Sequence, residues 1–156
     1  MKRGNTSKMS PKGFSKLEHL GVIVRDLDKA IRFYESLGIG PFEEMSADVM
    51  SGLTDKTMYG VSVDFELRAA VAKMGGVNLE LIQPVKDAPL MENFLKTKGE
   101  GIHHLGFLVD NLEEETVKLT GKGCRIILSV KLPDGRGAVY LDTGKVGGVV
   151  TEFLQS

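Results

Sequence analysis

The sequence contains a single cysteine, Cys124, and therefore no possible internal disulfide. Chains without disulfides are typical of reducing compartments. We therefore expect a cytoplasmic protein in which Cys124 is a small, buried apolar residue.

A strong net charge and a long apolar run are also missing. Lys and Arg number 20 and Asp and Glu number 21, which gives a formal net charge of −1. Surfaces that bind nucleic acid or membranes usually carry an excess of basic charge, and no run approaches the ~18 apolar residues of a membrane span. We expect neither nucleic acid nor a membrane as a partner.

Residues 1–15 contain basic side chains but no acidic residue and no apolar stretch. A secretory signal needs such a stretch, so this segment predicts a flexible N-terminal arm instead. The remaining residues, 16–156, predict one domain. Of the 156 residues 42% are hydrophobic and 26% are charged, which is typical of globular proteins.

An internal repeat is the main feature of the sequence. The segments 17–24 and 101–109 share the sequence His-Leu-Gly, and their histidines, His19 and His104, are 85 residues apart (104 − 19). The match continues through a possible helix N-cap, Asp26 or Asn111, to a glycine that follows each predicted helix. The chain therefore contains two copies of one structural unit.

Alternation and helical spacing predict the same elements in each copy. In the first copy we expect a strand at 17–24, a helix from Asp26 to Leu37, and strands near 41–49, 61–70 and 77–83, with a loop at 50–60 and Pro84 ending the last strand. In the second we expect a strand at 102–109, a helix from Asn111 to about Gly121, and strands near 125–130, 138–142 and 149–154.

This order of elements predicts an α+β fold made of paired βαβββ modules. Module one covers about 16–85, a connecting helix covers about 87–98, and module two covers about 101–156. The two modules are not separated by a Pro- or Ser-rich linker, so we expect them to pack as one body.

Two histidines and two glutamates occupy equivalent positions in the modules. Strand alternation directs His19 and His104 inward and His103 to the opposite face. Glu80 and Glu152 lie between apolar residues on the last strand of each module, where a carboxylate is costly to bury without a partner or a cation. Imidazole nitrogen and carboxylate oxygen suit a divalent first-row metal, so these four residues predict a metal site.

The motifs around these residues resemble the vicinal-oxygen-chelate superfamily. The motifs are Leu-Glu-His-Leu-Gly-Val at 17–22, Asn-Leu-Glu-Leu-Ile-Gln-Pro at 78–84, Gly-Glu-Gly-Ile-His-His-Leu at 99–105 and Gly-Gly-Val-Val-Thr-Glu at 147–152. The superfamily includes glyoxalases, extradiol dioxygenases, bleomycin-resistance proteins and methylmalonyl-CoA epimerases, and the motifs are most similar to those of the epimerases. The resemblance implies a mixed sheet that curls around one divalent metal ion per chain, held by His19, Glu80, His104 and Glu152.

The resemblance also implies cobalt, nickel, zinc or manganese as the metal, a homodimer, and an acyl-CoA thioester as substrate. A metal-dependent epimerase of the methylmalonyl-CoA type would remove and return the proton alpha to the thioester through a metal-stabilised enolate. Glu152 is then the candidate for one base. Asp64 and Glu66, on the strand before Glu80, are the candidates for a second acid or base.

Two other functions remain open. A glyoxalase I-like lyase or isomerase would use the same four ligands on a thiol–carbonyl adduct. A metal-free small-molecule binding protein of the bleomycin-resistance type would share the fold without the chemistry. Segments 46–74 and 132–145 differ most from the epimerase sequences and shape the substrate pocket, so they bear on this choice.

Overall fold

The computed structural model describes residues 16–156, and the predicted N-terminal arm, residues 1–15, lies outside the described residues. Module one contains β1 (Lys16–Ile23), α1 (Leu27–Ser36), β2 (Phe42–Glu44), α2 (Ala47–Ser51), β3 (Thr54–Met58), β4 (Val61–Ser62), β5 (Glu66–Met74) and β6 (Val77–Lys86). After α3 (Pro89–Lys98), module two contains β7 (Gly101–Val109), α4 (Leu112–Thr120), β8 (Ile126–Lys131), β9 (Gly137–Leu141) and β10 (Val150–Gln155).

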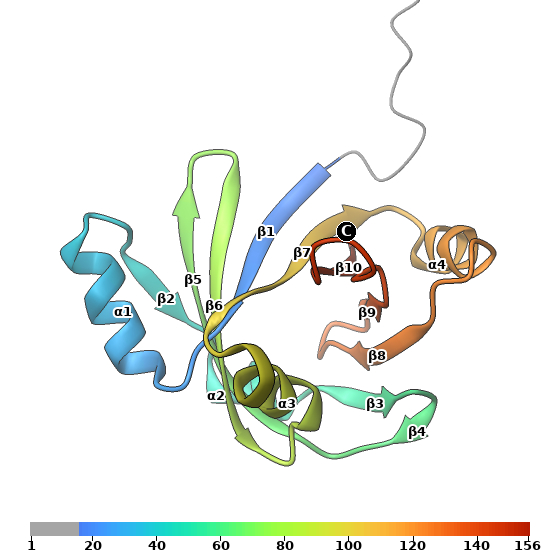
Figure 1. The fold of residues 1–156 in the computed structure, drawn as a ribbon, viewed down its shortest axis with the longest axis horizontal. Coiled ribbons are helices and arrows are strands. Elements are labelled where there is room, and N and C mark those ends of the chain that lie inside the picture. Colours follow the sequence, from blue (N-terminus) through green and yellow to red (C-terminus); the bar gives the residue numbers. More distant parts are fainter. Residues whose placement is uncertain (1–15) are drawn as a thin grey trace, which may run out of the picture.

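The strands of both modules form one mixed sheet that curls without closing into a barrel (Figure 1). Its order is β2-β5-β6-β1-β7-β10-β9-β8-β3-β4. β1 and β7 are antiparallel at the centre, while β6 lies parallel to β1 and β10 lies parallel to β7. The predicted α+β fold with paired modules is confirmed, and the two modules meet through their histidine-bearing strands.

The long helix of each module covers the outer side of its own strands. α1 packs against β5 and β6, and α4 packs against β9 and β10, at opposite ends of the molecule (Figure 1). The predicted caps are present, because Asp26 Oδ1 accepts a hydrogen bond from Lys29 N at 2.9 Å and Asn111 Oδ1 accepts one from Glu114 N at 3.0 Å. These caps satisfy backbone amides that have no partner within the helix.

The segment after β2 differs from the prediction of a strand at 41–49 and a loop at 50–60. β2 ends at Glu44, and the Ser46 side chain caps α2 by accepting a hydrogen bond from Val49 N at 3.3 Å. The chain then forms β3, which pairs with β8 of module two. Thr57 lies opposite Ser129, 72 residues later in the chain, and a local sequence pattern carries no information about a partner so distant.

The strands predicted at 61–70 and 77–83 also differ from those in the structure. The expected strand at 61–70 is interrupted, because β4 covers only Val61–Ser62 and β5 begins at Glu66. Pro84 does not end β6, which continues to Lys86. The β5–β6 register shifts between Glu66 and Leu67 at this point, and a proline without an amide donor is tolerated in a strand where the ladder is already irregular.

Candidate metal centre

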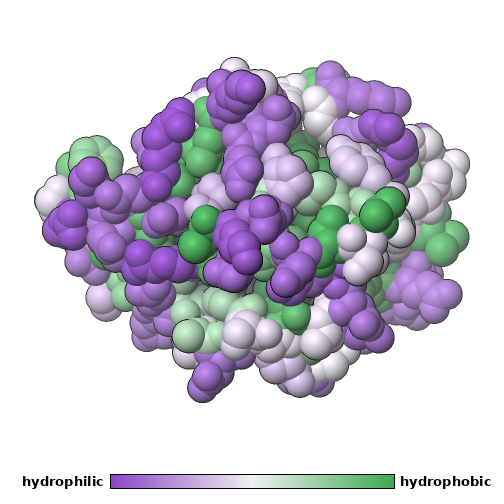
Figure 2. Space-filling view, turned by 90° about the horizontal axis from the view of Figure 1, so that it is seen from below, coloured by the Kyte–Doolittle hydropathy of each residue, from purple (hydrophilic) through white to green (hydrophobic). Residues whose placement is uncertain are grey.

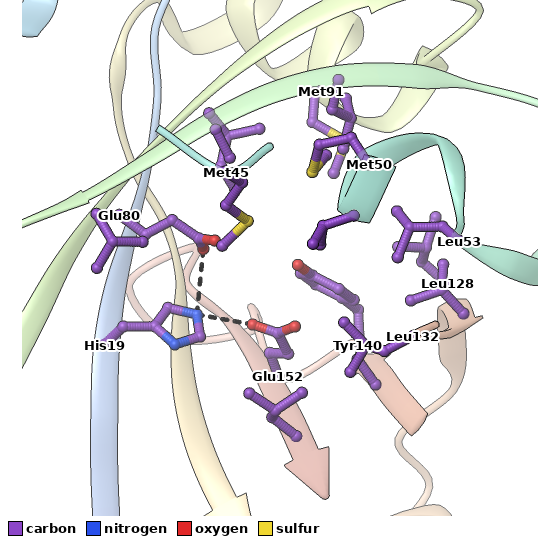
Figure 3. Close-up of a pocket in the computed structure, with 18 of the residues that line it drawn as sticks. His19, Met45, Met50, Leu53, Glu80, Met91, Leu128, Leu132, Tyr140 and Glu152 are labelled. Atoms are coloured by element: carbon purple, nitrogen blue, oxygen red, sulfur yellow. Dashed lines mark hydrogen bonds and ion pairs between the residues drawn. The ribbon is translucent and has the colours of Figure 1, made fainter. Parts of the chain in front are cut away.

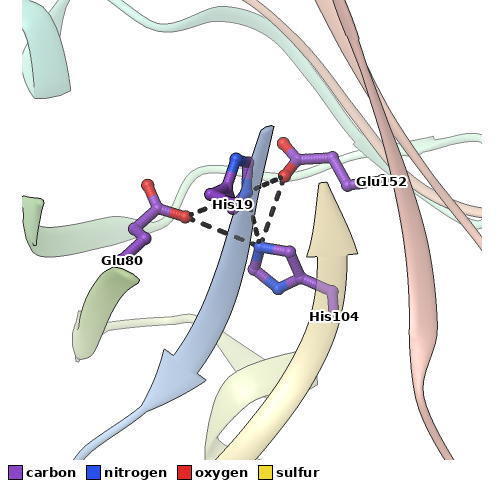
Figure 4. Close-up of side chains that lie close together, drawn as sticks. All are labelled: His19, Glu80, His104 and Glu152. Carbon is purple, nitrogen blue, oxygen red and sulfur yellow. Dashed lines mark hydrogen bonds and ion pairs between the residues drawn. The ribbon is translucent and has the colours of Figure 1, made fainter. Parts of the chain in front are cut away.

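The four predicted ligands lie on four neighbouring strands. Glu80 is on β6, His19 on β1, His104 on β7 and Glu152 on β10, and one ligand atom of each residue lies within 4.8 Å of those of the others (Figure 4). The repeat places them symmetrically, because Gly21 pairs with both Glu80 and His104, and Gly106 pairs with both Glu152 and His19.

The Nε2 atoms of the two histidines face one oxygen of each carboxylate. His19 Nε2 lies 2.8 Å from Glu152 Oε2 and 3.3 Å from Glu80 Oε2, and His104 Nε2 lies 3.3 Å and 3.5 Å from the same two oxygens. The two Nε2 atoms are 3.1 Å apart. All four side chains are at least 88% buried, with the greatest exposure, 12%, at Glu80.

The glycine in each His-Leu-Gly repeat makes room for the histidine of the other module. A Cβ atom at Gly21 would overlap the imidazole ring of His104, and a Cβ atom at Gly106 would overlap the ring of His19. Neither glycine has a positive φ, so the close approach of the ring is what excludes a side chain here. The repeated motif therefore encodes two interlocked halves of one site.

A β-bulge precedes each histidine of the cluster. Along β1 the register shifts between Leu17 and His19, which leaves Glu18 as the additional residue, and the shift between Gly21 and Val22 leaves His103 as the additional residue of β7. Glu18 and His103 occupy the same position in the two modules. Simple alternation predicts that His103 faces away from His104, but with this bulge His103 Nδ1 lies 3.1 Å from His104 Nδ1, and His103 is 3% exposed.

These two residues contact the rear nitrogens of the histidines. His19 Nδ1 lies 2.5 Å from Glu18 Oε2, and Asn78 Nδ2 donates to the other oxygen of that carboxylate at 2.5 Å. His103 Nδ1 lies 3.1 Å from His104 Nδ1. When His19 Nδ1 and His104 Nδ1 are the donors in these contacts, the Nε2 atom of each ring presents its lone pair toward the cluster. This is the tautomer that a metal requires.

The charges of the cluster strongly affect its histidines. Burial by itself lowers the pKa of His19, but hydrogen bonds with Glu152 and Glu18 outweigh it and raise the pKa to about 11. The pKa of His104 is raised in the same way by Glu152 and Glu80 against the effect of burial. Burial and the neighbouring charge of His104 lower the pKa of His103 to about 4, so His103 is neutral and can accept a hydrogen bond.

The cluster fits a divalent cation. Two buried carboxylates face the same point and attract positive charge, which protons on the histidines supply in the absence of a metal. The oxygen and nitrogen donors match the preferences of first-row divalent metals, and metal binding would replace those protons. His19, Glu80, His104 and Glu152 are thus the residues that would hold the ion.

A cavity of about 210 Å³ lies beside the cluster and is reached by three of its members: His19, Glu80 and Glu152 (Figure 3). The hydroxyl of Tyr140 points into the same space, next to the carboxylate of Glu152. Tyr140 lies directly across the β9–β10 ladder from Glu152. Burial, together with the negative charges of Glu152 and Glu80, raises the pKa of Tyr140 well above its usual range, so the hydroxyl keeps its proton.

The sequence does not single out Tyr140, because a tyrosine within an apolar strand is ordinarily a core residue. Conversely, the structure does not bring Asp64 or Glu66 to the cavity. The Asp64 side chain is 91% exposed and pairs with Lys56 at 3.0 Å. Glu66 is exposed at the start of β5, whose cavity-lining residues are Leu67, Ala69 and Val71.

Comparison with known proteins places the chain in a family. The profile of the Glyoxalase/Bleomycin resistance protein/Dioxygenase superfamily matches residues 18–140. The chain belongs to this superfamily. The human mitochondrial methylmalonyl-CoA epimerase is 30% identical over 144 residues, which cover 90% of this chain and 74% of the relative.

Solved epimerases share the fold. A variant of the Streptomyces coelicolor methylmalonyl-CoA epimerase, in complex with 2-nitronate-propionyl-CoA, is 22% identical, with a TM-score of 0.69 over 92% of this chain and 99% of that chain. The Mycobacterium tuberculosis methylmalonyl-CoA epimerase is 22% identical, with a TM-score of 0.66 over 95% of this chain and 93% of that chain. The likeness at 22% identity shows that the chain shares the fold of these epimerases.

Among residues 16–156 no helix has the length and apolar character needed to cross a membrane. Seen from below relative to Figure 1, the surface shows hydrophobic residues in small groups among hydrophilic ones (Figure 2).

Proposed function

We propose that the chain is a metal-dependent epimerase of the methylmalonyl-CoA type. The observation that carries this proposal is the convergence of four ligand atoms beside a cavity that is lined by three of these residues, Glu152 among them, and by Tyr140. Epimerases among the homologues, and the acyl-CoA compound bound in one of the solved structures, support an acyl-CoA thioester as the substrate.

His19, Glu80, His104 and Glu152 would hold one cobalt, nickel, zinc or manganese ion. When bound, the ion supplies a positive charge that stabilises the negative charge developing on substrate oxygens. Burial raises the pKa of the Glu152 carboxyl, but hydrogen bonds with His104 and His19 outweigh it and hold this pKa well below its usual range, so the group is ionised, which is the form that accepts a proton.

Inversion of a carbon centre needs a proton-transfer group on each face of that carbon. Glu152 is our choice for one face, since it borders the cavity and belongs to the buried cluster. Among residues 16–156, the other titratable side chains lining the cavity are Glu18, Tyr140 and the remaining cluster members. Glu18 already bonds to His19 and Asn78, so we assign the second face to Tyr140: its hydroxyl would donate a proton to the alpha carbon there, and the phenolate so formed would take that proton back in the reverse direction.

The first test is exchange of the alpha proton of methylmalonyl-CoA in deuterated water, followed by NMR on metal-loaded protein. Glu152→Gln should slow exchange by roughly 10²–10⁴-fold, the usual contribution of a general base. Glu66→Gln makes the same chemical change outside the cavity and should leave exchange within about twofold of the unchanged chain. No exchange by the unchanged, metal-loaded protein would contradict the proposal, and exchange on a thiol–carbonyl adduct instead would favour the glyoxalase-like alternative.

Tyr140→Phe tests the second face separately. If Tyr140 serves one face, the variant should still exchange the proton of one epimer while exchange of the other epimer and net epimerisation fall by at least about 100-fold. The two epimers are therefore assayed one at a time. Equal exchange of both epimers by Tyr140→Phe would remove Tyr140 from the reaction and leave Glu152 unaffected.

We also propose a cytoplasmic homodimer, on the basis of the family resemblance and the single cysteine. Light scattering of the purified chain measures its assembly state directly, and a monomeric mass would contradict this part of the proposal.

A further inference from the structure

The cavity beside the four-residue cluster has a largely apolar wall. Apart from His19, Tyr140 and the three carboxylates, every lining residue is aliphatic, a methionine or a phenylalanine. Within residues 16–156, no Lys, Arg, Ser, Thr, Asn or Gln side chain lines it. Figure 3 shows the part of this wall farthest from His19, which includes Met50, Leu53, Leu128 and Leu132.

This wall comes from both modules and from the segment that crosses between them. Met50 lies in α2 and Leu53 just after it, whereas Leu128 lies on β8. Their side chains face the cluster across the cavity (Figure 3). Polar chemistry is thus confined to one side of the cavity, and the opposite side offers only dispersion contacts and burial of apolar surface.

Such a wall does not suit the pantetheine arm of an acyl-CoA. That arm carries two amides and a hydroxyl, each of which would lose its hydrogen bonds to water here without a side chain to replace them. A hydrocarbon group loses no hydrogen bonds on entering the same space. The arm is therefore better placed toward solvent, with a hydrocarbon part of the acyl group against the wall.

The volume of the cavity sets the size of that hydrocarbon part. A water-sized group, and hence a methyl group, accounts for about 30 Å³, whereas the cavity measures about 210 Å³. The carboxylate and the thioester carbonyl of the substrate would fill the part of the cavity beside His19, Glu80 and Glu152, and a methyl substituent would leave the opposite, apolar wall without contacts. Given the proposed function, on which this step rests, we infer that the preferred substrate is a 2-alkylmalonyl thioester whose alkyl group has several carbons, placed against Met50, Leu53, Leu128 and Leu132.

This inference predicts how activity depends on chain length. Each methylene that becomes buried should raise kcat/KM roughly fourfold, so 2-butylmalonyl-CoA should exceed methylmalonyl-CoA by on the order of 50-fold. The same metal-loaded protein is assayed with both compounds for alpha-proton exchange in deuterated water. Calorimetry with free methylmalonate and butylmalonate, which lack the CoA arm, gives an independent measure of the same preference.

Met50→Phe narrows the cavity and should reduce the advantage of the butyl compound over methylmalonyl-CoA at least about tenfold. Met74→Phe makes the same change at a half-exposed residue away from the cavity and should leave the preference intact. Leu132→Phe provides a second narrowing variant if Met50→Phe does not fold.

The outcomes distinguish this inference from the proposed function. Faster exchange and tighter binding of the butyl compounds, lost in the narrowing variants alone, would establish the inference. Faster exchange of methylmalonyl-CoA, with no gain from a longer chain, would overturn the inference and leave the epimerase proposal standing. Absence of exchange with either compound, in protein shown to contain the metal, would overturn both.

Discussion

Gly21 and Gly106 show how a single missing side chain can define a site. Each glycine leaves the space that the histidine of the other module occupies. Gly21→Ala should therefore displace His104 and weaken metal binding roughly 10- to 100-fold, comparable to the loss of a group that orients a ligand. Competition with a chelator measures this affinity. Gly76→Ala is the matched control, because no atom lies within 4 Å of the Cβ position there, and an equal loss in that variant would contradict the explanation.

Glu18 and His103 perform the same task with different charges. The carboxylate behind His19 is a stronger acceptor than the neutral imidazole behind His104, so Glu18→Gln should lower metal affinity by roughly tenfold. Glu66→Gln serves as control. Nitrogen NMR of the metal-free and metal-loaded forms should show a change in the His19 ring protonation pattern in Glu18→Gln and none in the control; an unchanged ring would show that Glu18 does not orient His19.

The sequence predicts the cluster but not its surroundings. His19, Glu80, His104 and Glu152 are recognisable because each appears in register with a partner in the other module. Tyr140 belongs to module two alone and follows an ordinary strand pattern, so the repeat gives no signal for it. Asp64 was a reasonable acidic candidate by sequence, but its side chain is turned to Lys56 and solvent, which only the arrangement of β3 and β5 determines.

At the scale of elements, β3 is the strand whose position depends most on the whole fold. Thr57 Oγ1 and Ser129 Oγ form a 2.7 Å hydrogen bond between β3 and β8. Thr57→Val keeps the shape of the side chain and removes this bond, which should cost about 1 kcal/mol of unfolding free energy. Thr54→Val, at an exposed position of β3, should cost much less.

Hydrogen exchange localises the effect of this change. In Thr57→Val the amides of β3 and β8 should exchange faster, while those of β1 and β7 at the centre of the sheet keep their protection. If the amides of all strands exchange faster by the same factor, β3 does not open independently of the rest of the sheet.

The elements that the sequence predicts well are those with local signals. Both module helices have capping side chains and helical spacing, and β9 in module two is a short apolar run that is buried throughout. The segment from Ser46 to Phe65 contains a short helix and two short strands, and the longer of these strands is stabilised by a partner in the other module. Tertiary pairing therefore determines this part of the chain, where local propensity is weak.

For the whole molecule, the metal and the protons of the histidines compete for the same site. In metal-free protein the pKa of His19 is about 11, above the value of 6.5 for an unperturbed histidine. A histidine whose pKa is raised on folding stabilises the folded state fully at pH values below the pKa of the unfolded chain. This contribution is lost as the pH rises through the pKa of the folded state. The Tm of chelator-treated protein should therefore fall from about pH 7 to about pH 10.

A bound cation would take over the role of those protons, so the metal-loaded protein should lose less Tm over the same range. Thermal scans of both forms at several pH values make the comparison. His19→Gln removes the titrating group and should flatten the fall in the metal-free form. A metal-free Tm that rises with pH across this range would contradict the assignment of charge to His19.

The crossing of β3 has a consequence for dividing the molecule into its two repeats. In sequence β3 belongs to module one, but its hydrogen bonds join it to β8 of module two. There it covers the outer edge of β8. A fragment beginning at Gly101 would expose that edge and would also lose the pairing of β7 with β1. Unpaired edges of this kind promote aggregation. We expect the second repeat to be insoluble when produced alone and to be recovered when residues 1–100 are produced in the same cell.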